Sequence, residues 1–173
     1  MQKSFHFIRH GKISKKISHI FKGREHEPLS DQGKKDVLQK CKELEAVGIK
    51  KIYTSPCLRA YQTAQIIAQN LNCPMEVLAD LDEWHMTLRR LFLGVLNVLK
   101  LSPPFFEGTL ETPKMFKERI EKLLRTLIRN DEKILVVSHG YFLKMLLHVM
   151  KPGKKHPFFK KSLPHAHIIK IEF

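Results

Sequence analysis

Two histidines in matching surroundings are the residues of this 173-residue chain that are best suited to chemistry. His10 and His139 each follow a short apolar run, and each is followed directly by a glycine. The two runs, residues 5–9 and 134–138, have the length and composition of buried strands. Ligands of open α/β sheets bind beyond the carboxyl ends of the strands. We therefore expect both imidazoles to face one pocket.

Two further segments carry groups that would complete such a pocket. Residues 55–64 read Ser-Pro-Cys-Leu-Arg-Ala-Tyr-Gln-Thr-Ala, and residues 81–83 read Leu-Asp-Glu. Taken in order with Arg9-His10-Gly11 and Ser138-His139-Gly140, these segments resemble the histidine phosphatase superfamily, which has phosphoglycerate-mutase-like folds. The resemblance covers nearly the whole chain.

The resemblance implies a phosphatase that works through a covalent phosphohistidine on His10. Neutral imidazole is a competent nucleophile toward phosphorus, and its attack splits hydrolysis into two easier steps. Arg9 and Arg59 are suited to hold the phosphate because a guanidinium offers a planar fork of donors that stays charged. By resemblance, His139 is the third side chain of the phosphate pocket. Bound phosphate would favour its protonated form, whereas His10 must keep one ring nitrogen free.

An acidic residue is needed to protonate the departing alcohol. Glu83 is our prediction for this acid, because the Leu-x-Glu pattern of the family falls on residues 81–83. Asp82 is the competing assignment, and both acids could instead cap or solvate the loop.

Two further residues, Ser55 and Gly140, are candidates for supporting roles in the site. Ser55 is expected to orient His10, to contact the phosphate, or only to cap its helix. The backbone N–H of Gly140, at a helix start, is a natural anion donor.

Cationic side chains around the expected pocket indicate a strongly anionic substrate. Lys16 lies near the place where many family members have a phosphate-contacting Asn, and Lys22 and Arg24 lie in the segment that supplies substrate contacts in the family. His165 follows Pro164 where relatives carry an Asn-containing turn, so it is expected at the pocket rim. The alternative for Lys22 and Arg24 is that both are simply exposed loop cations.

The segment between Glu83 and Thr112 is short and apolar, without the long insertions that shape a mutase site. It therefore favours a phosphatase over a phosphoglycerate-type mutase. A phosphohistidine or phosphoprotein phosphatase and a non-catalytic phosphoanion-binding module remain alternatives. The exposed part of the Leu- and Phe-rich stretch is a candidate surface for a homodimer.

The elements expected to position these groups alternate between strands and helices. Helices are predicted from residue 31 to Gly48, from Ser55-Pro56 to residue 71, over 81–101, from Thr112 to 128 and from 141 to 150. Strands are predicted at 51–54, 75–78 and 165–173, besides the two that precede the histidines. The order predicts one domain over residues 1–173, a three-layer α/β/α fold whose mostly parallel sheet has helices on both faces.

Composition narrows the classes of partner. The chain has 31 Lys and Arg against 17 Asp and Glu, a formal net charge of +14. This balance attracts phosphorylated metabolites and other polyanions. The cations are scattered and lack interleaved aromatic residues, so we expect a phosphorylated small molecule or phosphopeptide and not nucleic acid.

The three cysteines share no metal-ligand spacing and are odd in number. They predict a reduced protein with inert thiols, no metal site and no cofactor. The first residues lead straight into a strand without the features of a secretory signal, and no apolar run reaches the length of a membrane span. The expected location is the cytoplasm.

Overall fold

The computed structural model describes residues 4–14, 27–83, 111–152 and 163–173. Within them, five strands form one sheet with the order β3-β2-β4-β1-β5. These strands are β1 (Ser4–Arg9), β2 (Lys51–Thr54), β3 (Met75–Val77), β4 (Ile134–Ser138) and β5 (Ile168–Glu172). All neighbouring strands pair in parallel except β5, which runs antiparallel to β1.

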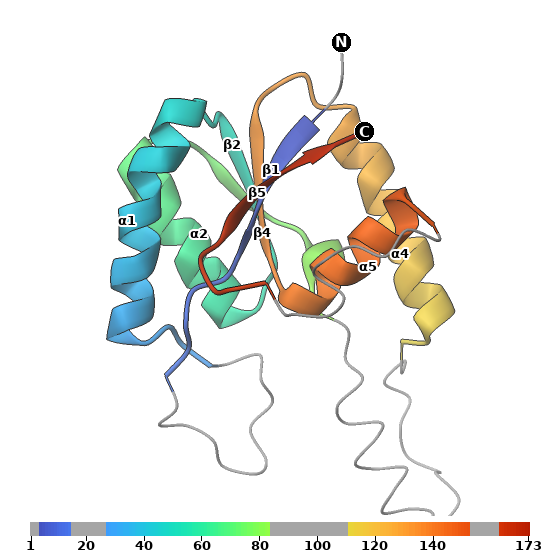
Figure 1. The fold of residues 1–173 in the computed structure, drawn as a ribbon, viewed down its shortest axis with the longest axis horizontal. Coiled ribbons are helices and arrows are strands. Elements are labelled where there is room, and N and C mark those ends of the chain that lie inside the picture. The colour runs from blue at the N-terminus through green and yellow to red at the C-terminus, as the bar shows by residue number, and fades with distance from the viewer. Residues whose placement is uncertain (1–3, 15–26, 84–110, 153–162) are drawn as a thin grey trace, which may run out of the picture.

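Helices cover both faces of the sheet, which confirms the predicted fold class (Figure 1). Helices α1 (Asp31–Val47) and α2 (Leu58–Leu71) lie on one face, and α4 (Pro113–Ile128) and α5 (Gly140–Met150) lie on the other. Each face has its own apolar core. Phe7 and Val136 belong to the core under α4 and α5, whereas Ile8 and Val137 belong to the core under α1 and α2. This alternation along β1 and β4 follows from the two-residue period of a strand.

Three helix ends have residues of the types that favour helix caps. The hydroxyl of Ser30 accepts a hydrogen bond from the backbone N–H of Gly33 at the start of α1, and that of Thr112 accepts one from Met115 at the start of α4. Gly48 ends α1 with φ 75°, a left-handed conformation that glycine adopts without steric cost.

The second predicted helix begins later than expected. We placed its start at Ser55-Pro56, but α2 begins at Leu58, and its N-cap residue Cys57 forms no side-chain cap bond. The reason is that the backbone N–H of Ser55 still bonds to Val137 of β4, so the chain follows the sheet for one residue beyond β2.

The predicted helix over 81–101 was wrong at its start. A short 3-10 helix, η3 (Ala79–Leu81), comes first, and Asp82 follows in an extended conformation. The rest of that prediction, residues 84–101, lies outside the described residues, as does the proposed dimer surface. The last strand also begins later than predicted, at Ile168, because a turn at Ala166 with φ 53° precedes it. In the described parts of the chain no helix has the length and apolar character that a membrane crossing requires.

Candidate active site

The pairing of β1 with β4 brings the two histidines together. Arg9 and Ser138 are partners in the parallel register, so His10 and His139 follow at the same edge of the sheet. Their ring centroids are 5.2 Å apart, and both residues are buried. The expected convergence of the two imidazoles is therefore present.

The surroundings of His10 fix which ring nitrogen is free of a proton. Nδ1 lies 2.8 Å from the carbonyl oxygen of Gly11, which can only accept, so Nδ1 carries the hydrogen. Nε2 therefore has the lone pair, and it accepts from Nε of Arg59 at 3.3 Å. Burial is the largest cause that lowers the pKa of His10 to about 3; the positive charges of Arg59 and Arg9 act in the same direction, and the bond to Gly11 opposes them. His10 is thus a neutral imidazole at physiological pH.

Arg59 lies in the first turn of α2 and links the polar groups of the site. Its Nη2 lies 3.1 Å from Nδ1 of His139 and 3.1 Å from Oε2 of Glu83. Arg59 itself is 4% exposed. A buried guanidinium beside the lone pair of His10 can neutralise an oxyanion bound there.

His139 is held from both ring nitrogens. Because a guanidinium only donates, Nδ1 accepts from Arg59, and Nε2 therefore carries the hydrogen and donates to Oγ of Ser55 at 2.9 Å. Ser55 in turn donates to Oδ1 of Asp82 at 3.1 Å. Ser55 therefore contacts the second histidine, where the sequence led us to expect contact with His10 or a helix cap.

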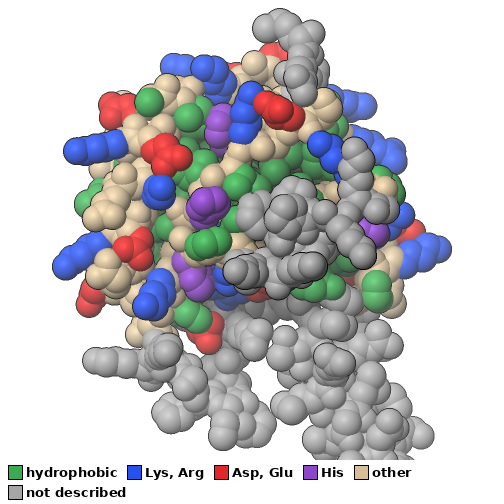
Figure 2. Space-filling model, viewed as in Figure 1, with side chains coloured by type: hydrophobic (Ala, Val, Ile, Leu, Met, Phe, Trp, Pro, Cys, Tyr) green, Lys and Arg blue, Asp and Glu red, His purple; other side chains and the backbone are tan. Residues whose placement is uncertain are grey.

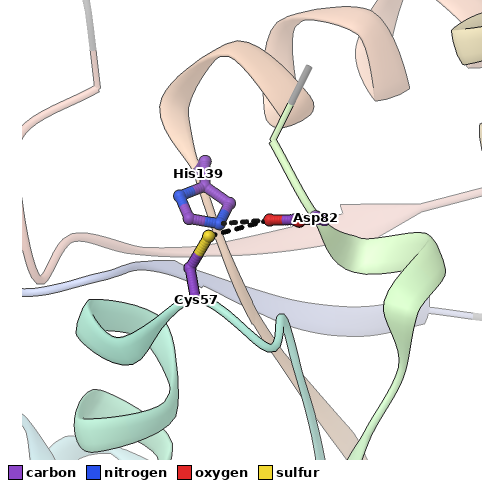
Figure 3. A group of neighbouring side chains, drawn as sticks. All are labelled: Cys57, Asp82 and His139. Atoms are coloured by element: carbon purple, nitrogen blue, oxygen red, sulfur yellow. Dashed lines mark hydrogen bonds and ion pairs between the residues drawn. The ribbon is translucent and has the colours of Figure 1, made fainter. Parts of the chain in front are cut away.

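The two acids have different surroundings. Oδ1 of Asp82 accepts from Ser55, from Sγ of Cys57 at 2.9 Å and from the backbone N–H of Glu83 at 2.8 Å. Figure 3 shows Cys57, Asp82 and His139 converging from three segments of the chain. The side chain of Glu83 is 29% exposed, and its Oε2 lies 3.6 Å from Nδ1 of His139. Glu83 thus lies on the Nδ1 side of His139, next to Arg59, whereas Asp82 lies on the Nε2 side of the same ring.

Three other predicted residues lie at the edges of this site. Arg9 donates to the carbonyl oxygen of Leu163, and burial lowers its pKa while Glu83 opposes that shift. Gly140 is the buried first residue of α5, directly after His139. His165 is exposed, but its ring centroid lies 5.3 Å from that of His10. The positions of His165 and Gly140 are those that the sequence led us to expect.

The predicted loop cations Lys16, Lys22 and Arg24 lie outside the described residues. On the face drawn in Figure 2, Lys and Arg side chains lie around the margin and among acidic ones, without gathering into one patch. This distribution matches the scattered cations of the sequence.

The sequence analysis did not identify two residues that position the site, Thr63 and Arg119. The backbone N–H of Gly11 donates to Oγ1 of Thr63, which itself donates to the carbonyl oxygen of Arg59. On α4, Arg119 donates to the carbonyl oxygens of Asp80 and Asp82. A signal for both was available, because Thr63 is four residues from Arg59 and Arg119 lies within an apolar helical stripe.

The likeness to known proteins extends from sequence to fold. One relative, the probable phosphoglycerate mutase GpmB of Cronobacter sakazakii, is 32% identical over 92 residues, which make up 53% of this chain and 40% of that protein. A probable phosphatase of Schizosaccharomyces pombe is 28% identical over 88% of this chain and 81% of its own. The chain thus matches less than half the length of the first relative and most of the second.

The fold resembles that of mycobacterial glucosyl-3-phosphoglycerate phosphatase in its complex with VO3. The TM-score is 0.68 at 17% identity, over 97% of this chain and 90% of that one. The sequence profile of the histidine phosphatase superfamily (branch 1) matches residues 5–89 and 97–173. Together with the two histidines and two arginines at the carboxyl edge of the sheet, this match shows that the chain belongs to the histidine phosphatase superfamily.

Proposed function

We propose that the protein hydrolyses phosphomonoesters through a phosphohistidine on His10. The observation that carries this proposal is the lone pair on Nε2 of a buried, neutral His10, with Nε of Arg59 3.3 Å away. A nucleophile and an anion-binding group thus share one space. The phosphatase-named relatives of the family support the same reaction class.

In the first step Nε2 of His10 attacks phosphorus, and a P–N bond forms while the ester P–O bond breaks. Arg9 and Arg59 offset the negative charge that spreads over the other phosphoryl oxygens. His139 is the third group around the phosphate, and the backbone N–H of Gly140 is an additional donor at the start of α5.

Glu83 is the group that we assign to protonate the leaving oxygen. A phosphoryl group that takes over the guanidinium of Arg59 would release the Glu83 carboxyl from its 3.1 Å ion pair. Asp82 is less suited to this role, because three donors already occupy its Oδ1. In the second step water attacks the phosphorus of phospho-His10, Glu83 accepts a proton of that water, and the P–N bond breaks so that Nε2 of His10 regains its lone pair and inorganic phosphate leaves.

The proposed substrate is a phosphorylated small molecule or a phosphopeptide, and the reaction needs no metal ion. The net charge of +14 supports a substrate with more than one anionic group. The arginines supply the charge neutralisation that a metal ion provides in other phosphoryl-transfer enzymes.

The first test is the His10→Ala variant. We expect it to have no measurable turnover of a phosphate ester, and acid-labile radiolabel from a labelled ester should appear on the wild type alone. The control is His167→Ala, which removes an exposed histidine near the same sheet edge. Turnover by His10→Ala, or a wild type that is active only with added divalent metal, would refute the proposed mechanism.

Phosphoglycerate mutase activity is the second candidate, because a relative with that name is 32% identical over 92 residues. The two activities differ in product. A phosphatase releases inorganic phosphate from a phosphoglycerate, whereas a mutase returns an isomer with its phosphate retained. Product analysis by phosphorus NMR separates them.

A further inference from the structure

Cys57, Asp82 and His139 form a cluster of ligand-type atoms that all lie within 4.8 Å of one another (Figure 3). The proposed reaction has no step for the thiol. Cys57 is 4% exposed and His139 is fully buried, while the side chain of Asp82 is 18% exposed. A cysteine sulfur, an imidazole nitrogen and a carboxylate oxygen are the three donor types that bind Zn²⁺ in proteins.

The spacing of these atoms is close to that of a tetrahedral zinc site. Sγ of Cys57 lies 2.9 Å from Oδ1 of Asp82, and that oxygen lies 3.8 Å from Nε2 of His139. Ligand atoms around zinc are about 3.3–3.7 Å apart, given bonds of roughly 2.0–2.3 Å. Side-chain shifts of about half an ångström would therefore admit the ion. Oγ of Ser55, 2.9 Å from Nε2 and 3.1 Å from Oδ1, is in place as a fourth, neutral donor.

The groups around the cluster also suit a divalent cation. The other ring nitrogen of His139, Nδ1, lies 3.6 Å from Oε2 of Glu83 and 3.1 Å from Nη2 of Arg59, so Glu83 accepts from Nδ1 once that guanidinium turns aside. Such a carboxylate behind a ligating histidine is a recurrent feature of zinc sites, because it holds the ring and its tautomer. With Cys57 as thiolate, three negative groups (Cys57, Asp82 and Glu83) offset the two charges of the ion and that of Arg59.

We propose that Cys57, Asp82 and His139 bind Zn²⁺ or a similarly thiophilic divalent cation, and that this ion inhibits the enzyme. When Nε2 of His139 ligates the ion, the ring stays neutral and is held next to Cys57 and Asp82. His139 then no longer serves as a charged donor to phosphate. The inhibition rests on the proposed phosphatase function, whereas the binding does not.

Binding is an exchange of protons for the metal ion. The Sγ–H bond of Cys57 breaks, an Sγ–Zn bond forms, and the proton passes to solvent. His139 gives up the hydrogen on Nε2 and takes one on Nδ1. Because Nη2 of Arg59 now donates to Nδ1 at 3.1 Å, this guanidinium must turn aside before Nδ1–H can donate to Glu83. The imidazole stays neutral, and no group is oxidised or reduced. The proton of the buried thiol leaves as the metal ion binds, since a thiolate and not a thiol ligates zinc.

The binding test uses Cd²⁺ and Zn²⁺ with the full-length protein after removal of metal by chelation. Cd²⁺ should produce a thiolate charge-transfer absorption in the wild type. In Cys57→Ser, which can still donate to Asp82, this band should vanish and the dissociation constant for Zn²⁺ should rise at least about tenfold. The matched control is Cys41→Ser, since Cys41 is a second buried thiol, in α1. Absence of the band in the wild type, or unchanged affinity in Cys57→Ser, would overturn the site.

The activity test compares each variant with its own metal-free rate. Zn²⁺ should inhibit the wild type and Cys41→Ser over the concentration range in which it binds, and chelation should restore the rate. Cys57→Ser should resist the same concentrations. Equal inhibition of Cys57→Ser would overturn the inhibitory role, even where binding holds. A wild type without phosphatase activity would refute the proposed function, while the Cd²⁺ and Zn²⁺ measurements would still decide the metal site.

Discussion

At the scale of single residues, the segment 55–64 shows why particular side chains recur at particular positions. Arg59 points to the two histidines, while Gln62 accepts from the backbone N–H of Leu29 and Thr63 accepts from that of Gly11. Ala60 and Ala64 are fully buried between α2 and its neighbours. One helix therefore holds Arg59 against the two histidines and also binds the end of β1 and the loop that follows it.

The neutral state of His10 makes stability depend on pH. The pKa of the folded form is about 3, against 6.5 for the ordinary residue, so the unfolded chain binds more protons between these values. The free energy of unfolding therefore rises with pH across this window. The stabilisation that comes from keeping His10 neutral is fully present above pH 6.5 and is lost as the pH falls toward 3. We expect His10→Gln to reduce the slope of unfolding free energy against pH by up to about 1.4 kcal/mol per unit. Denaturant titrations at several pH values measure it, and an unchanged slope would contradict the assignment.

Thr63 is predicted to hold the end of β1 in place. Thr63→Val keeps the shape of the side chain but leaves the buried N–H of Gly11 without its 3.0 Å acceptor. The free energy of unfolding should fall by about 1–3 kcal/mol. Thr126→Val, at an exposed position of α4, is the control and should have a much smaller effect. Equal stability of the two variants would show that the bond contributes little.

At the scale of elements, residues 80–83, which include Asp82 and Glu83, are held in place by side chains that lie outside the site. Ser138 at the end of β4 donates to the carbonyl oxygen of Leu81 at 2.7 Å. Arg119 of α4 bonds to the carbonyl oxygens of Asp80 and Asp82, and Glu111 binds its guanidinium through both carboxylate oxygens. The placement of Glu83 thus depends on the docking of α4 against η3 and β4.

Loss of Arg119 should therefore affect the step that needs the acid. Arg119→Met is expected to slow turnover of an alkyl phosphate more than that of a nitrophenyl phosphate, whose leaving group needs no proton. Glu83→Gln should show the same selectivity with a larger loss, about 100-fold or more on the alkyl ester. Arg125→Met, at an exposed site of α4, is the control. Equal losses on both esters would indicate a purely structural effect of Arg119.

At the scale of the whole molecule, one sheet has an apolar core on each face, and the chain has a formal net charge of +14. The cores bury the strands that end in the histidines, so the candidate site lies at the edge of the sheet between the two helix layers. The positive charge does not select a fold, but it attracts anionic molecules.

The net charge of +14 predicts a salt-dependent rate of substrate capture. Charges are screened over about 30 Å at 0.01 M salt and about 8 Å at 0.15 M. The kcat/KM for a substrate with several negative charges should therefore fall with added NaCl more steeply than that for a simple monoester. Steady-state kinetics over a salt series test this, and the same slope for both substrates would argue against long-range steering.

The sequence by itself determined the elements, the fold class and the family. These predictions rest on local features, which can be recognised without knowledge of distant contacts. The features are the hydrophobic period, the helix caps at Ser30, Thr112 and Gly48, and the motifs around His10, Arg59 and His139. The predictions failed at the ends of elements: at Ser55, which continues the hydrogen bonding of the sheet, at Leu81, which ends a 3-10 helix, and before Ile168, where a turn precedes the last strand.

Only the tertiary structure decided which side chains meet. Ser55 contacts His139 across 84 positions of sequence, Cys57 contacts Asp82 across 25, and Arg119 contacts Asp82 across 37. Such contacts depend on the strand order, on the register of β1 with β4 and on the docking of α4, and no local period encodes them. This is why the residues of the proposed reaction could be read from motifs, whereas the network that orients them could not.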